Sequence, residues 1–195
     1  MNKFFLISIM FASCSFFGFS FFNFLGFDHN ELPSKNVIID KACGHALKEL
    51  QKKYSIKMIG SGGSEENKKE TMIAASYSLN EVLSKEQCRK LILDCADELL
   101  KQINQREDLK VYLCEVPFSY KSIEIRIFLR NPDRSDIQPP NICIVSLIDG
   151  VIAYKVEDMN AIGHLRRIEE LYEDALKIVQ TQNIEATPKN DQKGI

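Results

Sequence analysis

The clearest pattern of hydrophobic and polar positions in the chain lies between Ser84 and Asn104. Apolar residues recur there at steps of three and four, which predicts an amphipathic helix with one buried stripe. The stripe consists of Cys88, Leu91, Ile92, Cys95, Leu99 and Ile103. Ser84 and Gln87 have the spacing of a capping box, in which each residue's side chain satisfies the backbone N–H of the other. We therefore expect the helix to begin at this pair.

A second clear pattern follows Pro117, through which a helix cannot continue. Aliphatic residues there alternate with polar or aromatic ones, and a period of two predicts a strand with one buried face. The inward set is Ile123, Ile125, Ile127 and Leu129, and the outward set is Glu124, Arg126, Phe128 and Arg130. The helix and the strand each have an apolar face to bury, so we expect them to pack together.

The same two periodicities predict the other elements in chain order. They indicate a helix over Val37–Tyr54, a strand over Ser55–Ile59, a flexible turn over Gly60–Ser64, a charged loop over Glu65–Glu70, a strand over Thr71–Leu79, strands over Ile142–Ile148 and Val151–Val156, and a helix over Gly163–Gln180. Asp149-Gly150 is the best hairpin turn in the chain, because a type I′ turn needs positive φ at both central positions.

The predicted element order is therefore α-β-β-α-β-β-β-α. Consecutive strands with short connections predict an α+β fold, with a mainly antiparallel sheet of about five strands and three helices packed on one face. Residues 28–36 are expected to form a linker, residues 37–180 a single domain, and residues 181–195 a disordered tail. With 195 residues, 45% of them hydrophobic, the chain can bury the core of one such domain.

Residues 1–27 have a different character from the rest. Lys3 is their only charged residue, and Phe, Leu and Ile dominate the segment. This composition predicts an export signal or a membrane anchor. About 20 apolar residues span a bilayer, whereas the apolar part of a secretory signal has about 7–15, so length alone does not decide between them.

Three interpretations of this segment stay open. A signal peptide could be cleaved near Ala12-Ser13 or near Gly18-Phe19-Ser20. Phe11-Ala12-Ser13-Cys14 resembles the lipidation site of bacterial lipoproteins, with Cys14 as the lipidated residue and Phe11 in place of the usual leucine. An uncleaved segment would be a transmembrane helix. All three predict a membrane-associated or exported protein of the bacterial envelope or periplasm, and flanking charges do not settle its orientation.

The charge balance argues against a nucleic-acid partner. Beyond residue 27 the chain has 24 basic and 27 acidic residues, and neither the total nor any local run provides a basic face.

The cysteines complicate the choice of compartment. Cys88 and Cys95 lie about 10 Å apart along one helix, too far to bridge each other, and are interpreted as core residues. Cys43 and Cys143 also lie in apolar surroundings, and only Cys114 is expected to be exposed. The disulfide state of Cys43, Cys114 and Cys143 is left open.

Few residues suggest chemistry. Gly60–Gly63 follows a predicted strand, but a phosphate-binding loop needs Gly-Lys-Ser/Thr, and two glutamates follow Ser64 instead. Histidine and cysteine spacing predicts no metal site, and no cofactor is expected. Cys114 and His164 could meet as a nucleophile pair only through the fold, and no catalytic residue is assigned.

The strand face is more suggestive, because arginine and aromatic residues are enriched at contact hot spots. Tyr120, Arg126, Phe128 and Arg130 are therefore the candidate protein-contact surface. The leading hypothesis is a non-enzymatic interaction or structural module held at a membrane by its N-terminus. The alternative is a small-ligand-binding domain or enzyme with a site near Gly60–Gly63 or Cys114.

Overall fold

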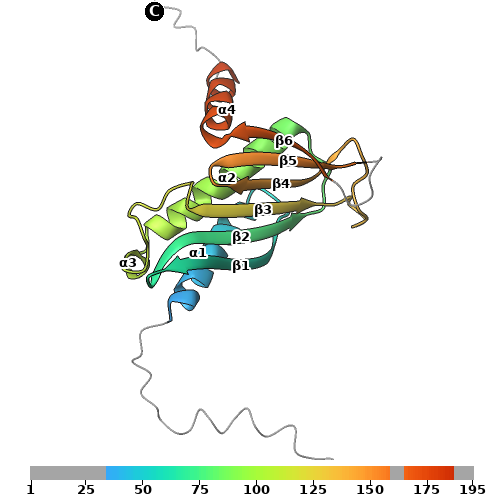
Figure 1. Ribbon diagram of the computed structural model, residues 1–195. Coiled ribbons are helices and arrows are strands. Elements are labelled where there is room, and N and C mark those ends of the chain that lie inside the picture. The colour runs from blue at the N-terminus through green and yellow to red at the C-terminus, as the bar shows by residue number, and fades with distance from the viewer. Residues whose placement is uncertain (1–33, 159–164, 187–195) are drawn as a thin grey trace, which may run out of the picture. The chain divides into compact units, whose positions relative to one another are not determined.

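The computed structural model describes residues 34–158 and 165–186, all within the compact unit that begins at Pro33. These residues form one sheet with the strand order β1-β2-β3-β4-β5-β6 (Figure 1). The elements are α1 (Lys35–Leu50), β1 (Lys57–Glu66), β2 (Lys69–Leu79), α2 (Lys85–Asn104), α3 (Glu107–Lys110), β3 (Ile123–Leu129), β4 (Ile142–Ile148), β5 (Val151–Glu157), β6 (Leu165–Leu171) and α4 (Tyr172–Ala186).

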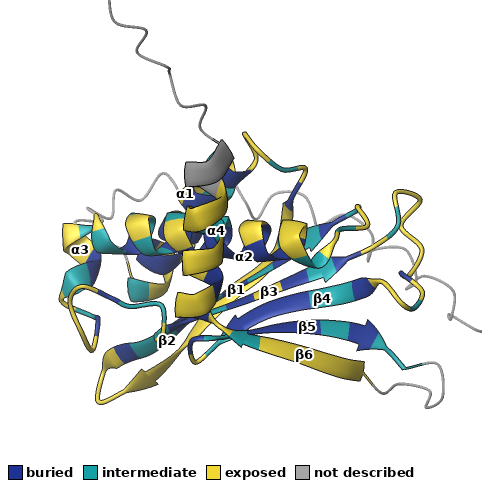
Figure 2. Ribbon diagram, turned by 90° about the horizontal axis from the view of Figure 1, so that it is seen from above, coloured by how far each residue is buried: buried dark blue, intermediate teal, exposed yellow. Residues whose placement is uncertain are grey.

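The predicted α+β class is confirmed. Every pair of neighbouring strands is antiparallel except β2 and β3, which are parallel and are connected through α2. The described residues form six strands and four helices, whereas the sequence predicted about five strands and three helices. The helices lie on one side of the sheet, and no described helix covers the other side (Figure 2).

Helix α2 begins as its sequence predicts. The Ser84 hydroxyl accepts a hydrogen bond from the Gln87 amide, and the Gln87 side chain accepts one from the Ser84 amide. The six residues of the predicted stripe are fully buried. At the other end of α2, the Asn104 side chain forms hydrogen bonds of 3.0 and 2.7 Å with the backbone of Phe118. The helix is therefore fixed at both ends, and its buried stripe packs against the inward residues of β3, β4 and β5.

The first two strands pair as an antiparallel hairpin, but the turn and the charged loop predicted between them were placed wrongly. Gly60–Gly63 lies inside β1, and the turn is formed by Asn67 and Lys68, with φ of 51° and 66°. A Cβ atom on Gly63 would lie 2.7 Å from the Glu70 carboxylate and from the backbone oxygen of Met72. This glycine therefore permits a close approach within the hairpin. Glu70 is buried there and forms an ion pair of 2.6 Å with Lys35, the first residue of α1.

The prediction of one helix over Gly163–Gln180 was also wrong. Residues Leu165–Leu171 form the edge strand β6, which pairs with β5, and α4 starts only at Tyr172. Leu165, Ile168 and Leu171 follow a step of three that resembles a helix. The register with β5 instead alternates the side chains between the two sheet faces, and this places Glu170 beside α2.

Neighbouring residues of β3 should differ sharply in their effect on stability. Ile127 is fully buried under the helices, so Ile127→Ala should lower the free energy of unfolding by about 3 kcal/mol. Phe128 points to the uncovered face and is only half-buried, so Phe128→Ala should cost about 1 kcal/mol. Urea unfolding of the full chain in mild detergent measures both values. Equal losses would show that the outer face is also packed core.

Candidate functional site

Two of the predicted contact residues lie at the centre of the uncovered sheet face. Arg126 stands between Ser76 of β2 and Ser146 of β4, and Phe128 stands between Ser78 and Ile144. The Arg126 guanidinium forms an ion pair with Glu124 on the same face, and the arginine side chain is 48% exposed to solvent. This face therefore presents an arginine and a phenylalanine side by side on a rigid strand.

The surroundings of these two residues have low relief. Three of the four residues that flank them on the neighbouring strands are serines, and the fourth is Ile144. A Cβ atom added to Gly60 or Gly62 of β1 would meet nothing within 4 Å. The partly exposed residues that share the face across β2, β4 and β5 are Ala74, Ser76, Ser78, Ile144, Ile148, Val151 and Lys155. The result is a shallow, mixed apolar and polar surface, which we call the open face together with Glu124, Arg126 and Phe128.

The other two predicted contact residues do not join the open face. Tyr120 stacks on Tyr172 with 4.5 Å between ring centroids, and its hydroxyl donates to Glu173 at 2.6 Å, so it holds the start of α4. Arg130 turns into the loop after β3, where it donates to the Arg134 carbonyl and lies 3.8 Å from Asp136. Both residues therefore already have structural partners within the chain.

A half-buried cluster that the sequence analysis missed joins α2 to the edge strand. The Arg89 guanidinium makes two hydrogen bonds to the Glu170 carboxylate, at 2.7 and 2.9 Å. The Tyr154 hydroxyl also donates to Glu170, and Lys85 lies 5.2 Å above the Tyr154 ring. The helix predicted over Gly163–Gln180 would place Glu170 on its polar face, so the sequence pattern gave no sign of this cluster.

The cluster favours the ionised form of its carboxylate. Burial alone would raise the pKa of Glu170, but the hydrogen bonds from Arg89 and Tyr154, with the positive charges of Arg89 and Lys85, outweigh it and hold this pKa below its usual value of 4.5. Burial and the hydrogen bond to Glu170 raise the pKa of Tyr154, and the positive charge of Arg89 opposes this only in part. The cluster is satisfied internally, so we assign it a structural role in fastening β6 to α2.

The cysteines of the core are poor candidates for chemistry. Burial raises the pKa of the Cys43 thiol to about 11 and that of Cys88 to about 12, and it raises the pKa of Cys95 as well. The Tyr77 hydroxyl lies in the same core, and no hydrogen-bond partner for it is found among the described residues. A thiolate is strongly disfavoured in such surroundings.

Cys114 is exposed, as predicted, and its amide donates to the Glu70 carbonyl. His164, Cys14 and all of residues 1–27 lie outside the described residues, so the Cys114–His164 pair and the lipidation site stay predictions. His45 is exposed on α1. Within residues 34–158 and 165–186, no group of three or more metal-binding side chains comes together.

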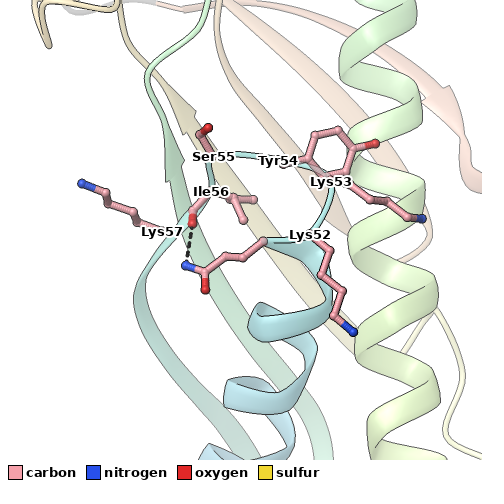
Figure 3. Close-up of a pocket in the computed structure, with 7 residues that line it drawn as sticks. Lys52, Lys53, Tyr54, Ser55, Ile56 and Lys57 are labelled. Atoms are coloured by element: carbon pink, nitrogen blue, oxygen red, sulfur yellow. Dashed lines mark hydrogen bonds between the residues drawn. The ribbon is translucent and has the colours of Figure 1, made fainter.

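One hollow of about 500 Å³ lies where α1 leads into β1, lined by residues 51–57 (Figure 3). It is open to solvent, and its lysines point apart. Lys52 pairs with Glu49 at 2.6 Å, and Lys53 lies 3.4 Å from Asp94. The Gln51 side chain donates to the Ile56 carbonyl across the hollow. Gln51, Lys52, Lys53 and Tyr54 are therefore engaged with groups of the protein itself, and the lysines do not converge on a common point.

Comparison with known proteins gives no family. No protein-family model, no curated protein and no solved structure matches this chain. Among the helices of the described residues, none is both long and apolar enough to cross a membrane.

Replacing the half-buried carboxylate of Glu170 should destabilise the fold in a pH-dependent way. Glu170→Gln leaves the Arg89 charge, only 8% exposed, without its counter-ion, and should cost about 2–3 kcal/mol at neutral pH. The pKa of Glu170 is depressed in the folded protein. The wild type should therefore have the higher free energy of unfolding above about pH 4.5, and this difference should disappear as the pH falls through the pKa of Glu170 in the folded protein. Unfolding curves between pH 3 and 7 test this; Glu49→Gln, at an exposed pair, is the control and should change little. A constant difference between Glu170→Gln and wild type down to pH 3 would contradict the assignment.

Thiol reactivity should follow burial. In the native full chain, Cys114 should react with a maleimide reagent rapidly, whereas Cys43, Cys88 and Cys95 should react only after unfolding, because they are buried and their pKa values are raised. Peptide mapping by mass spectrometry after timed labelling measures each rate. Rapid labelling of Cys88 or Cys95 would mean that the buried stripe of α2 is misassigned.

Proposed function

We propose that this chain is a non-enzymatic binding module that is held at a membrane by its N-terminal segment and contacts a protein partner through the open face. The observation that carries the proposal is that side chains are buried on one face of the sheet and partly exposed on the other. The helix face is filled with buried side chains, whereas the open face leaves Phe128, Ile144 and Arg126 partly exposed. Exposed apolar residues beside an arginine are typical of contact hot spots.

The shape of the open face favours a protein over a small ligand. Small-molecule sites are concave and bury most of the ligand, with a few polar groups aimed at one point. Three of the four residues that flank Arg126 and Phe128 on the open face are serines, which favours a shallow surface over an enclosed one. A surface of this kind can bury enough area only against another extended surface.

The proposed membrane association rests on the sequence of residues 1–27. The apolar run from residue 4 to 27 ends only a few residues before α1 begins at Lys35. If the segment stays as a helix up to residue 27, the seven residues 28–34 would keep the domain within roughly 25 Å of the bilayer. If Cys14 is lipidated instead, the 20 residues 15–34 would connect the domain to the bilayer and would reach at most about 70 Å. A partner found by the open face would then be another membrane or envelope protein.

The alternative of a small-ligand site or enzyme gains no specific support among the described residues. Gly60–Gly63 forms part of strand β1 instead of a loop, and Cys114 is exposed, with its amide bonded to the Glu70 carbonyl.

Site-specific photo-crosslinking tests the proposal. A benzoylphenylalanine in place of Phe128 should give a discrete adduct with one protein in the membrane fraction, and adding Arg126→Glu should remove it. The same photo-reactive residue at Val82, which is exposed in the loop before α2, is the matched control and should give no such adduct. An open face that yields no adduct, or one that Arg126→Glu leaves unchanged, would contradict the proposal.

A further inference from the structure

Strand β6 forms an edge of the sheet, and within the described residues its outer side has no strand beside it. Such an edge offers unpaired N–H and C=O groups and is a template for another strand. Large apolar residues are also exposed on this strand and on the helix that follows it. Five of the ten large hydrophobic residues that are exposed in the described chain lie on β6 and α4, with exposures of 37–56%. They are Leu165, Ile168, Leu171, Leu176 and Ile178.

The backbone of β6 determines which residues could pair on the outer side. The Tyr172 amide donates to the Gly150 carbonyl at 3.0 Å, and the register with β5 is continuous from Leu165 to Leu171. Backbone groups alternate in direction along an antiparallel strand. The even-numbered residues of β6 therefore bond to β5, and the odd-numbered residues present their N–H and C=O groups to the free edge.

The sequence of this edge is complementary to itself. It reads Leu165-Arg166-Arg167-Ile168-Glu169-Glu170-Leu171, so the residues on either side of Ile168 have opposite charges at equal distances. We propose that β6 pairs antiparallel with β6 of a second copy of this chain, about a twofold axis at Ile168. The facing pairs are then Ile168–Ile168, Arg167–Glu169, Arg166–Glu170 and Leu165–Leu171.

This register suits the backbone as well as the charges. Arg167 and Glu169 form an ion pair within each strand and Glu170 is held by Arg89, so the dimer adds a second partner to these charges. The pairs Arg167–Glu169 and Leu165–Leu171 join odd-numbered residues, whose N–H and C=O groups face outward and can bond to one another. Shifting the pairing by two residues preserves the hydrogen bonds but places Arg167 opposite Arg167, or Glu169 opposite Glu169. Like charges directly opposite are unfavourable, so the charge pattern selects one register.

The opposite edge of the sheet lacks these features. The register between β1 and β2 shifts after Met58 and again after Ser64, and irregular pairing of this kind protects an edge strand. β6 has no such shift. The twofold axis is perpendicular to the sheet, so both copies keep their helices on the same side. The dimer would therefore extend the open face into one continuous surface.

Charge reversal on purified full chain in mild detergent tests the pairing. Arg167→Glu places like charges opposite each other twice in the dimer, as does Glu169→Arg, so either variant should raise the dimer dissociation constant at least about tenfold. In a mixture of the two variants every facing pair is again of opposite charge, and a mixed dimer should form as tightly as the wild-type dimer. Differently tagged copies and sedimentation velocity measure this exchange.

Lys57→Glu makes a matched charge reversal at the β1 edge and should leave the dimer unchanged. Unfolding curves of both β6 variants establish that the fold is intact, and recovery in the mixture establishes it independently. A monomeric wild type, dimers that tolerate both single reversals, or failure of the mixture to associate would each overturn the proposal. If the copies associated only through the apolar N-terminal segment, the dimers would tolerate both single charge reversals.

Discussion

The architecture depends on the packing of α2 against one face of the sheet. Its buried stripe covers the inward side chains of β3, β4 and β5, its first turn is held by the Ser84–Gln87 box, and its last by Asn104. The same helix carries Arg89, which holds β6 through Glu170. Because α1 and α2 lie on the same side, the other face of the sheet is left without a cover among the described elements. The features that suggest function follow from this one-sided packing.

The sequence was sufficient to predict those elements whose structure is determined by residues close to one another in the chain. The alternation from Ile123 to Leu129 allowed only one orientation, because a slip of one residue would move every isoleucine to the other face. The Asp149-Gly150 turn was predicted from its own two residues, and both have positive φ, of 50° and 75°. The α+β class and the positions of Arg126 and Phe128 on the outer face followed from these elements.

The errors occurred where a residue's role depends on a distant partner. Gly63 is explained by the side chain of Glu70, and Glu170 by Arg89, 81 residues earlier in the chain. The spacing of Leu165, Ile168 and Leu171 suits a helix as well as a strand, and only the presence of β5 decides between them. Tyr120 was assigned to a contact surface because its contact with Tyr172 could not be seen in the sequence. On a helix, Arg166 and Arg167 would pair with Glu169 and Glu170 at i, i+3 and i, i+4, whereas on an edge strand the same charges are complementary to a second copy of the strand.

Oxidative footprinting of the open face, compared between the purified chain and native membranes, tests the central claim most directly. Hydroxyl radicals should oxidise Phe128 and Ile144 in the purified protein, because both side chains are partly exposed, and should leave the buried Ile127 unmodified. In membranes a bound partner should protect Phe128 and Ile144 severalfold. Equal oxidation of Phe128 in both preparations would show that the open face is simply solvated, and would contradict the account.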